Sequence, residues 1–262
     1  MQNRKTKNSL EAKLPNFFSF KSANDLIRIG KKNDGGYLVS QSDINMSDVL
    51  ISLGISDDWS FEENFVAKKN VEVFAYDASV NEKFFFKNFI LSLINVFNLK
   101  IAIYWLRVFF SYKKFFGQAQ NHHILKFVGV NTDDNTYCTL SSILNDMKYK
   151  NFFLKIDIEG SEYRMLDTLI LKQDRISGLV IEFHDCDLHL KSIKKFIQNF
   201  KLKLVHIHAN NYAPIRLDDG LPLVLELTFS KYCKVFNKSY LPHMFDMPNN
   251  KYRSEIIIKI KK

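Results

Sequence analysis

The stretch that decides the fold is Lys155-Ile156-Asp157-Ile158-Glu159-Gly160-Ser161-Glu162, where an apolar run ends in a group of acids. The run that leads into it, Phe152–Ile158, predicts a buried strand, and Ser161–Lys172 behind it predicts a helix. In an open α/β sheet, ligands bind beyond the carboxyl ends of the strands. These acids therefore mark one edge of a candidate binding cleft.

Six further runs rich in Val, Ile, Leu and Phe predict the rest of the sheet: Val49–Leu53, Val71–Tyr76, Ile124–Val130, Leu179–Phe183, Leu202–His208 and Leu223–Phe229. Helical patterns separate many of them, at Phe61–Asn70, Leu140–Lys148 and Leu188–Phe200. Strands that are apolar on both faces and alternate with helices indicate a parallel sheet covered on each side. Residues 210–221 are too few for a helical crossover, so we expect the last two strands to be antiparallel neighbours.

Length and composition are those of one globular domain. The 262 residues, 46 % hydrophobic and 25 % charged, suit a single domain over 1–262, with residues 1–25 as an N-terminal extension. The three cysteines, Cys138, Cys186 and Cys233, form no CxxC motif, which favours a reducing compartment. The basic start lacks the apolar segment of a signal peptide, and no uncharged apolar stretch is long enough to span a bilayer. We expect a cytoplasmic protein.

The formal charge of +9 is concentrated in three segments. Residues 1–13 carry +3, residues 83–114 carry +6 and residues 251–262 carry +4, so the remainder carries −4. Thirty of the 37 basic residues are Lys, whereas recognition of phosphates and bases favours the guanidinium of Arg. We therefore expect no nucleic-acid partner.

Residues 84–117 interrupt the alternation of strands and helices. The segment is helix-like, apolar on almost every face and dense in aromatic residues, and it contains no acid between residues 83 and 114. Three interpretations stay open. These are helices packed over the sheet or in a homodimer interface, a basic aromatic element in peripheral contact with an anionic membrane at its inner face, and a substrate lid.

The first two strand ends suit a cofactor that contains ribose. Gly54 allows a ligand to approach the backbone closely, and Asp77, at the end of the second strand, can accept both ribose hydroxyls. Their separation of 23 residues is near the roughly 20 that this pairing requires. The GxGxxG fingerprint of dinucleotide binding is absent, because Ser56 and Trp59 follow Gly54. S-adenosylmethionine, which has a ribose and no phosphate, fits these edges better than NAD or FAD.

The later strand ends supply candidate catalytic residues. His184 and His208 are candidate bases because imidazole titrates near neutral pH. Asp157 could orient an acceptor or the ammonium group of the cofactor, and Glu159 follows at the helix start, where the helix dipole alone would also favour an acid. A divalent cation is the second candidate ligand, held by Asp157, Glu182, His184 and His208, and it would lower the pKa of an acceptor hydroxyl.

Several motifs together resemble the FkbM-like S-adenosylmethionine-dependent methyltransferases, over about residues 26–248. They are Asp34-Gly35-Gly36-Tyr37, Leu53-Gly54-Ile55-Ser56, Tyr76-Asp77, the block from Lys155 to Glu162, Ile181-Glu182-Phe183-His184-Asp185 and Asn210-Asn211-Tyr212. The block around Asp157 is the most specific of them. The sequence departs from the usual family pattern in its single-glycine turn and in the 84–117 insertion.

The resemblance implies a Rossmann-like class I fold with strand order 3-2-1-4-5-7-6 and a helical insertion after strand two. It places Gly54, Ile55 and Ser56 beneath the methionine part of the cofactor and gives Asp77 the ribose. It also suggests that Asp34, Gly35 and Gly36 fold over the amino-acid end of the cofactor, although these residues also suit a plain two-residue hairpin turn. The implied reaction is O-methylation of a saccharide or saccharide-linked small molecule in surface polysaccharide (capsule) biosynthesis.

Two other functions compete with this interpretation. A metal-dependent hydrolase could use the same acid and histidine strand ends, but the chain has no compact metal motif beyond His206-Ile207-His208. A membrane-surface binding protein could use the 84–117 insertion and the basic tails.

Overall fold

A computed structural model describes residues 6–7, 11–94, 99–130, 133–236, 238–239 and 241–261. Its centre is a seven-stranded sheet in the order β12-β14-β11-β10-β5-β6-β7. All neighbouring pairs are parallel except the two pairs made by β14. The strands are β5 (Val49–Leu53), β6 (Glu72–Tyr76), β7 (Asn121–Ile124), β10 (Phe152–Ile156), β11 (Ile176–Phe183), β12 (Lys203–Ala209) and β14 (Leu225–Ser230).

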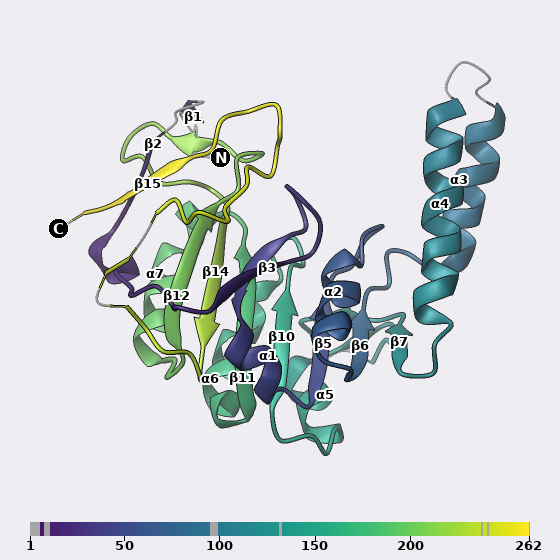
Figure 1. Ribbon diagram of the computed structural model, residues 1–262, viewed down its shortest axis with the longest axis horizontal. Coiled ribbons are helices and arrows are strands. Elements are labelled where there is room, and N and C mark those ends of the chain that lie inside the picture. The colour runs from purple at the N-terminus through teal and green to yellow at the C-terminus, as the bar shows by residue number, and fades with distance from the viewer. Residues whose placement is uncertain are drawn as a thin grey trace.

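The labels of Figure 1 also count short strands outside this sheet, so they differ from the numbers in the expected order. When only the seven strands of the large sheet are numbered along the chain, the order reads 3-2-1-4-5-7-6. The prediction that the last two strands are antiparallel neighbours is confirmed by the pairing of β12 with β14.

Alternating strand residues build two separate cores, which is why the strands are apolar on both faces. In β10, Phe152, Leu154 and Ile156 belong to one core, together with residues of α5 (Leu140–Asp146), α6 (Leu166–Lys172) and α7 (Cys186–Asn199). Phe153 belongs to the other, with residues of α1 (Gln41–Met46) and α2 (Ser60–Lys68). The sheet is therefore the middle layer of three.

The terminal segments lie together beside the large sheet (Figure 1). β2 (Glu11–Leu14) pairs in parallel with β15 (Ile257–Ile260), and β1 (Thr6–Lys7) pairs with β13 (Ile215–Arg216). A 3₁₀ turn, η1 (Asn16–Phe18), follows β2, and Phe18 is fully buried in the first core. The described residues of the N-terminal extension, 6–7 and 11–25, are therefore held to the body by both strand pairing and burial.

The third strand of the sheet was predicted wrongly. The expected run Ile124–Val130 is divided: β7 ends at Ile124, and Phe127–Val128 forms β8, which pairs with β9 (Tyr137–Cys138). β7 is an edge strand with the polar sequence Asn-His-His-Ile, so it lacks the apolar pattern of a central strand. The helix expected from Ser161 also differs, because a 3₁₀ turn, η3 (Glu162–Met165), precedes α6.

The 84–117 segment is a pair of helices, α3 (Glu82–Ile94) and α4 (Leu99–Phe116), that projects from the body (Figure 1). Its base packs against the body, where Trp59 contacts the rings of Phe85, Tyr112 and Phe116, and Tyr104 of α4 donates a hydrogen bond to Asp57. The base of the two helices shares a core with residues of β5 and β6, whereas their far end projects away from the sheet (Figure 1). No described helix is both long enough and apolar enough to pass through a membrane.

Candidate active site

A cavity of about 710 Å³ opens where β5, β6 and β10 end. It is bordered by the turn after β5 (residues 54–59), by residues 126–130 and by the loop between β3 (Leu26–Ile29) and β4 (Tyr37–Ser40). Eight of the predicted site residues line it: Asp34, Gly35, Gly54, Ile55, Ser56, Asp77, Asp157 and Glu159. The other four, Gly36, Glu182, His184 and His208, are not among the described lining residues.

Gly54 is required by the approach of two backbone segments. Its φ is +81°, and a Cβ atom there would lie 1.8 Å from the backbone oxygen of Asp157. The end of β10 thus presses directly against the first residue of the turn after β5. Any side chain at this position would force the two strand ends apart.

Asp77 holds the turn after β5 in place. Its Oδ2 accepts hydrogen bonds from the backbone N–H groups of Ile55 (3.1 Å) and Ser56 (2.9 Å). Its Oδ1 accepts from the N–H and hydroxyl of Ser79 (2.8 and 2.5 Å). Burial alone would raise the pKa of Asp77, but these hydrogen bonds outweigh it and lower the pKa. Asp77 is therefore a carboxylate at neutral pH.

A buried ion pair between Lys155 and Glu62 also stabilises the turn after β5, and the sequence analysis did not identify it. Lys155 donates a hydrogen bond to the backbone oxygen of Gly54 (2.7 Å), and its Nζ lies 3.7 Å from Oε1 of Glu62. The two side chains are 6 % and 0 % exposed. Burial opposes the charge of Lys155, but Glu62 and Asp157 outweigh it and raise the pKa of the amine. The sequence did contain a signal for this ion pair, because Lys155 is a charged residue within the otherwise apolar strand β10.

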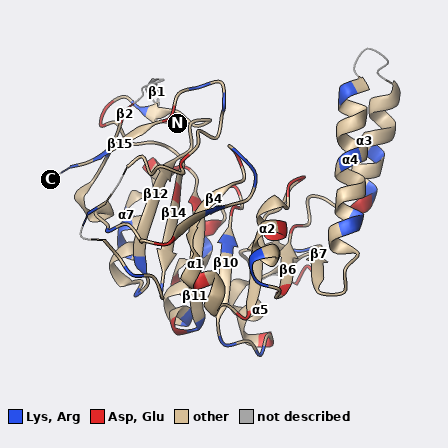
Figure 2. Ribbon diagram, viewed as in Figure 1, with Lys and Arg blue, Asp and Glu red and all other residues tan. Residues whose placement is uncertain are grey.

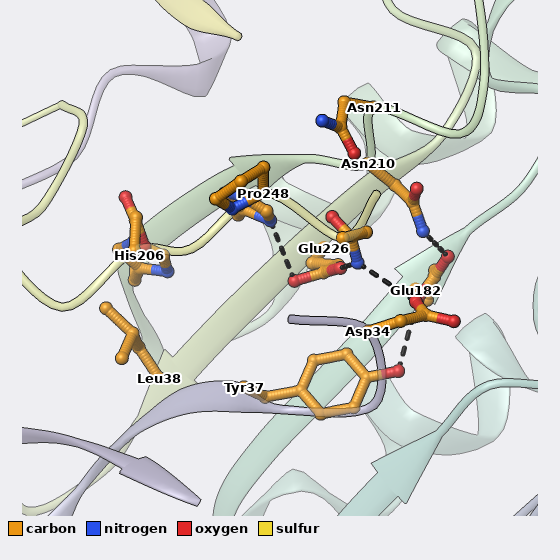
Figure 3. A network of polar contacts seen from close by, with 12 residues as sticks. Asp34, Tyr37, Leu38, Glu182, His206, Asn210, Asn211, Glu226 and Pro248 are labelled. Atoms are coloured by element: carbon orange, nitrogen blue, oxygen red, sulfur yellow. Dashed lines mark hydrogen bonds and ion pairs between the residues drawn. The ribbon is translucent and has the colours of Figure 1, made fainter. Parts of the chain in front are cut away.

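Tyr37 joins two strand-end carboxylates that are far apart in the sequence. Its hydroxyl lies 3.0 Å from Oδ2 of Asp157 and 3.1 Å from Oε2 of Glu182. Asn210 donates to the other oxygen of Glu182 (3.0 Å), and Figure 3 shows Glu182 between Asn210 and Tyr37. Burial and the charge of Asp157 raise the pKa of Glu182 well above its usual range.

The loop between β3 and β4 reaches the cavity through Asp34 and Gly35. It runs over residues 30–36, because Ile29 pairs with Tyr37, so the two-residue hairpin turn is excluded. Asp34 accepts a hydrogen bond from Asn249 (3.2 Å), which also donates to Glu226 (2.7 Å). Burial raises the pKa of Asp34.

His184 lies among acids. Its Nδ1 is 3.2 Å from Glu162, and its Nε2 is 3.4 Å from Glu159 and 3.6 Å from Glu182. Burial opposes the charged form, but the hydrogen bond and charge of Glu162 outweigh it and raise the pKa of the imidazole. Both nitrogens of His184 thus face carboxylates, and His184 is not among the described residues that line the cavity.

The four proposed metal ligands do not all converge. Ligand atoms of Asp157, Glu182 and His184 lie within 4.8 Å of one another, and His208 is not part of this group. These three side chains offer two carboxylates and one imidazole, a mixed oxygen and nitrogen set, and they are the part of the predicted metal site that the structure brings together.

His208 is buried between two carboxylates. Nδ1 lies 3.1 Å from Glu226 on β14, and Nε2 lies 3.1 Å from Glu255 in the C-terminal segment. Burial would lower the pKa of the imidazole, but these two partners raise it well above the usual value. His208 thus connects the C-terminal segment to the sheet, and both of its nitrogens are occupied.

This ion pair predicts a specific dependence of stability on pH. Because the pKa of His208 is higher in the folded chain than its ordinary 6.5, the stabilisation is complete below about pH 6.5. It falls by about 1.4 kcal/mol per pH unit as the pH rises toward the folded value. The difference in unfolding free energy between wild type and His208→Gln should therefore shrink from pH 6 to pH 9.

Urea denaturation at several pH values measures this difference. A difference that stays flat from pH 6 to pH 9 would show that His208 is not held protonated.

The cavity has the charge that S-adenosylmethionine requires. Six acidic and four basic residues are among its described lining residues, so it is net negative: Asp34, Asp57, Asp58, Asp77, Asp157 and Glu159 against Lys31, Lys126, Lys155 and Arg164. The cofactor carries a positive sulfonium and an ammonium group. The volume also lies in the range of ordinary small-molecule sites. The residues present therefore fit this cofactor, which the turn after β5, Asp77 and Asp34 would hold.

Comparison with known proteins identifies the family. Residues 45–201 match the methyltransferase FkbM domain. No curated protein matches the sequence. Among solved structures, precorrin-6y C5,15-methyltransferase from Geobacter metallireducens is similar at 12 % identity and a TM-score of 0.37, over 72 % of this chain and 84 % of that one. The fibrillarin pre-rRNA processing protein of Methanococcus jannaschii is similar at 12 % identity and 0.37, over 82 % and 86 %.

The domain match covers more than half of the chain, including the turn after β5, Asp77 and the strand end at Asp157. The methyltransferase activity and the use of S-adenosylmethionine rest on this match. The chain therefore belongs to the FkbM family of S-adenosylmethionine-dependent methyltransferases.

Proposed function

We propose that the protein methylates a hydroxyl oxygen of a saccharide or saccharide-linked acceptor in surface polysaccharide (capsule) biosynthesis. The observation that carries the hydroxyl acceptor is Asp157, which lines the cavity with one carboxylate oxygen held by Tyr37. Within the described part of the chain, Oδ1 of Asp157 has no hydrogen-bond partner and remains available. The saccharide class is supported by the family resemblance.

Two residues of the chain have separate roles in methyl transfer, one as the proton acceptor and the other in positioning that acceptor. When bound, the cofactor supplies an electrophilic methyl group on a positive sulfur. Asp157 accepts the proton of the acceptor hydroxyl as the oxygen attacks, because a sugar hydroxyl is too weak an acid to ionise first. Tyr37 fixes the carboxylate, so that Oδ1 faces the acceptor while Oδ2 stays bound. This step needs neither His184 nor His208 as the base.

Calorimetry with S-adenosylmethionine tests the cofactor site. Asp77→Ala removes the two hydrogen bonds that Asp77 accepts from the backbone of Ile55 and Ser56 in the turn after β5, so we expect at least a tenfold loss of affinity. Asp167→Ala is the matched control, since Asp167 on α6 is 88 % exposed. Its affinity should equal that of wild type.

Three results would contradict the proposed site. They are absence of binding to folded wild type, an unchanged affinity of Asp77→Ala, and an equal loss in Asp167→Ala. Thermal unfolding of each variant identifies cases in which the protein simply does not fold. The acceptor class needs a separate assay, in which methyl transfer to saccharides is compared with transfer to amine acceptors.

A further inference from the structure

We propose that the α3–α4 hairpin docks on an anionic lipid bilayer through its distal part, which is residues 87–94 of α3 and 99–107 of α4. This surface is outside the cavity and does not depend on the acceptor proposed above. The first feature of the distal part is a large exposed apolar area. Leu91, Leu93 and Ile94 on α3 are 51 %, 46 % and 74 % exposed, and Leu99, Ile101 and Ile103 on α4 are 58 %, 43 % and 49 % exposed. Large contiguous apolar patches of this kind mark interaction sites.

The charges of the hairpin are almost all positive. Between residues 82 and 116 there are six basic residues and one acid, Glu82, which pairs with Lys113 at the base (3.2 Å). Figure 2 shows this blue pattern on both helices. Lys87 and Arg107 lie about 10 and 12 Å along the helices from their distal ends, at 1.5 Å per residue.

This spacing fits a lipid surface. An interfacial helix buries its apolar side chains about 5–10 Å into the headgroup region and keeps basic residues beside the anionic lipids. The described residues 88–94 of α3 and Leu99 of α4 are uncharged, so they can enter this region, while Lys87 and Arg107 reach the headgroups. Lys100 is close to the distal end and has a flexible chain that can extend to the surface.

A second copy of the chain fits this surface less well. Pairing two hairpins would bring Lys87, Lys100 and Arg107 of both copies together, with no acid in the distal part to balance them. The exposed apolar residues also lie on both helices, so one partner hairpin would leave part of them in water. An anionic bilayer satisfies both the charge and the apolar area.

The hairpin also places the bilayer near the cavity. Tyr104 on α4 donates a hydrogen bond to Asp57 (2.5 Å), and Asp57 lines the cavity. A bilayer that holds the distal hairpin would therefore lie close to the side of the cavity that Asp57 lines.

Vesicle co-sedimentation of the full chain tests the proposal. Wild type should bind phosphatidylcholine vesicles that contain phosphatidylglycerol, bind vesicles of phosphatidylcholine alone far less, and lose binding as salt rises. A triple substitution, Leu91→Ser with Ile94→Ser and Leu99→Ser, should reduce binding at least tenfold. The matched control is Leu171→Ser with Leu188→Ser, because these leucines are 75 % and 61 % exposed outside the hairpin. It should bind like wild type.

Hydrogen exchange on wild type gives a second readout that needs no variant. Anionic vesicles should protect residues 82–116 and leave the other helices unchanged. Lack of binding to anionic vesicles, wild-type binding by the triple variant, or protection outside the hairpin would overturn the proposal. A dimer in light scattering that the triple variant dissociates would assign the surface to a second copy instead.

Discussion

Gly54→Ala is expected to lower the free energy of unfolding by about 3 kcal/mol or more and to abolish measurable binding of S-adenosylmethionine. An alanine at φ +81° is strained, and its Cβ would lie 1.8 Å from the backbone oxygen of Asp157. The neighbour is a backbone atom directly after the central strand β10, so it cannot rotate away as a side chain would. The turn must shift, and the N–H groups that Asp77 holds shift with it.

The chain offers a matched control at Gly160. Its φ is +96°, but a Cβ there would have no heavy atom within 4 Å. Gly160→Ala therefore carries the conformational strain without the clash, and we expect a cost of about 1 kcal/mol. Urea denaturation and cofactor calorimetry on both variants separate the two effects. Equal losses for Gly54→Ala and Gly160→Ala would show that the close contact does not matter.

The layered sheet was predictable because its signals are local. β10 is apolar on both faces, as Phe152 and Phe153 show by joining opposite cores. The acids at the strand ends were predictable for the same reason, since parallel strands bring their carboxyl ends to one edge. Asp157 and the turn at Gly54 therefore meet at the cavity as expected.

Other parts of the site depend on contacts that a sequence pattern does not carry. Tyr37 and Glu182 are 145 residues apart, and nothing local to either indicates that they meet. His208 lies in a strand, but its partner Glu255 comes from the C-terminal segment, so its structural role was hidden. The direction of the α3–α4 hairpin could not be predicted either, because an apolar helix can pack over a sheet or project away from it.

Asp157→Asn should reduce kcat by about 10² to 10⁴-fold, the usual effect of losing a general base. The substitution keeps the size and shape of the side chain, and Tyr37 can still form a hydrogen bond to the amide. It removes the carboxylate that we propose accepts the acceptor proton. Since the base acts only as the oxygen attacks, KM for the acceptor should change much less than kcat.

The control for this prediction is Asp167→Asn, which makes the same chemical change at a side chain that is 88 % exposed. Steady-state kinetics should match wild type. Calorimetry then distinguishes the two roles open to Asp157. If Asp157→Asn binds S-adenosylmethionine normally and kcat falls, the carboxylate acts on the acceptor. If binding is lost instead, Asp157 holds the ammonium group of the cofactor, and the base must be sought elsewhere on the cavity wall. A variant that retains kcat within about tenfold excludes Asp157 as the base, because no smaller loss fits proton removal in the transition state.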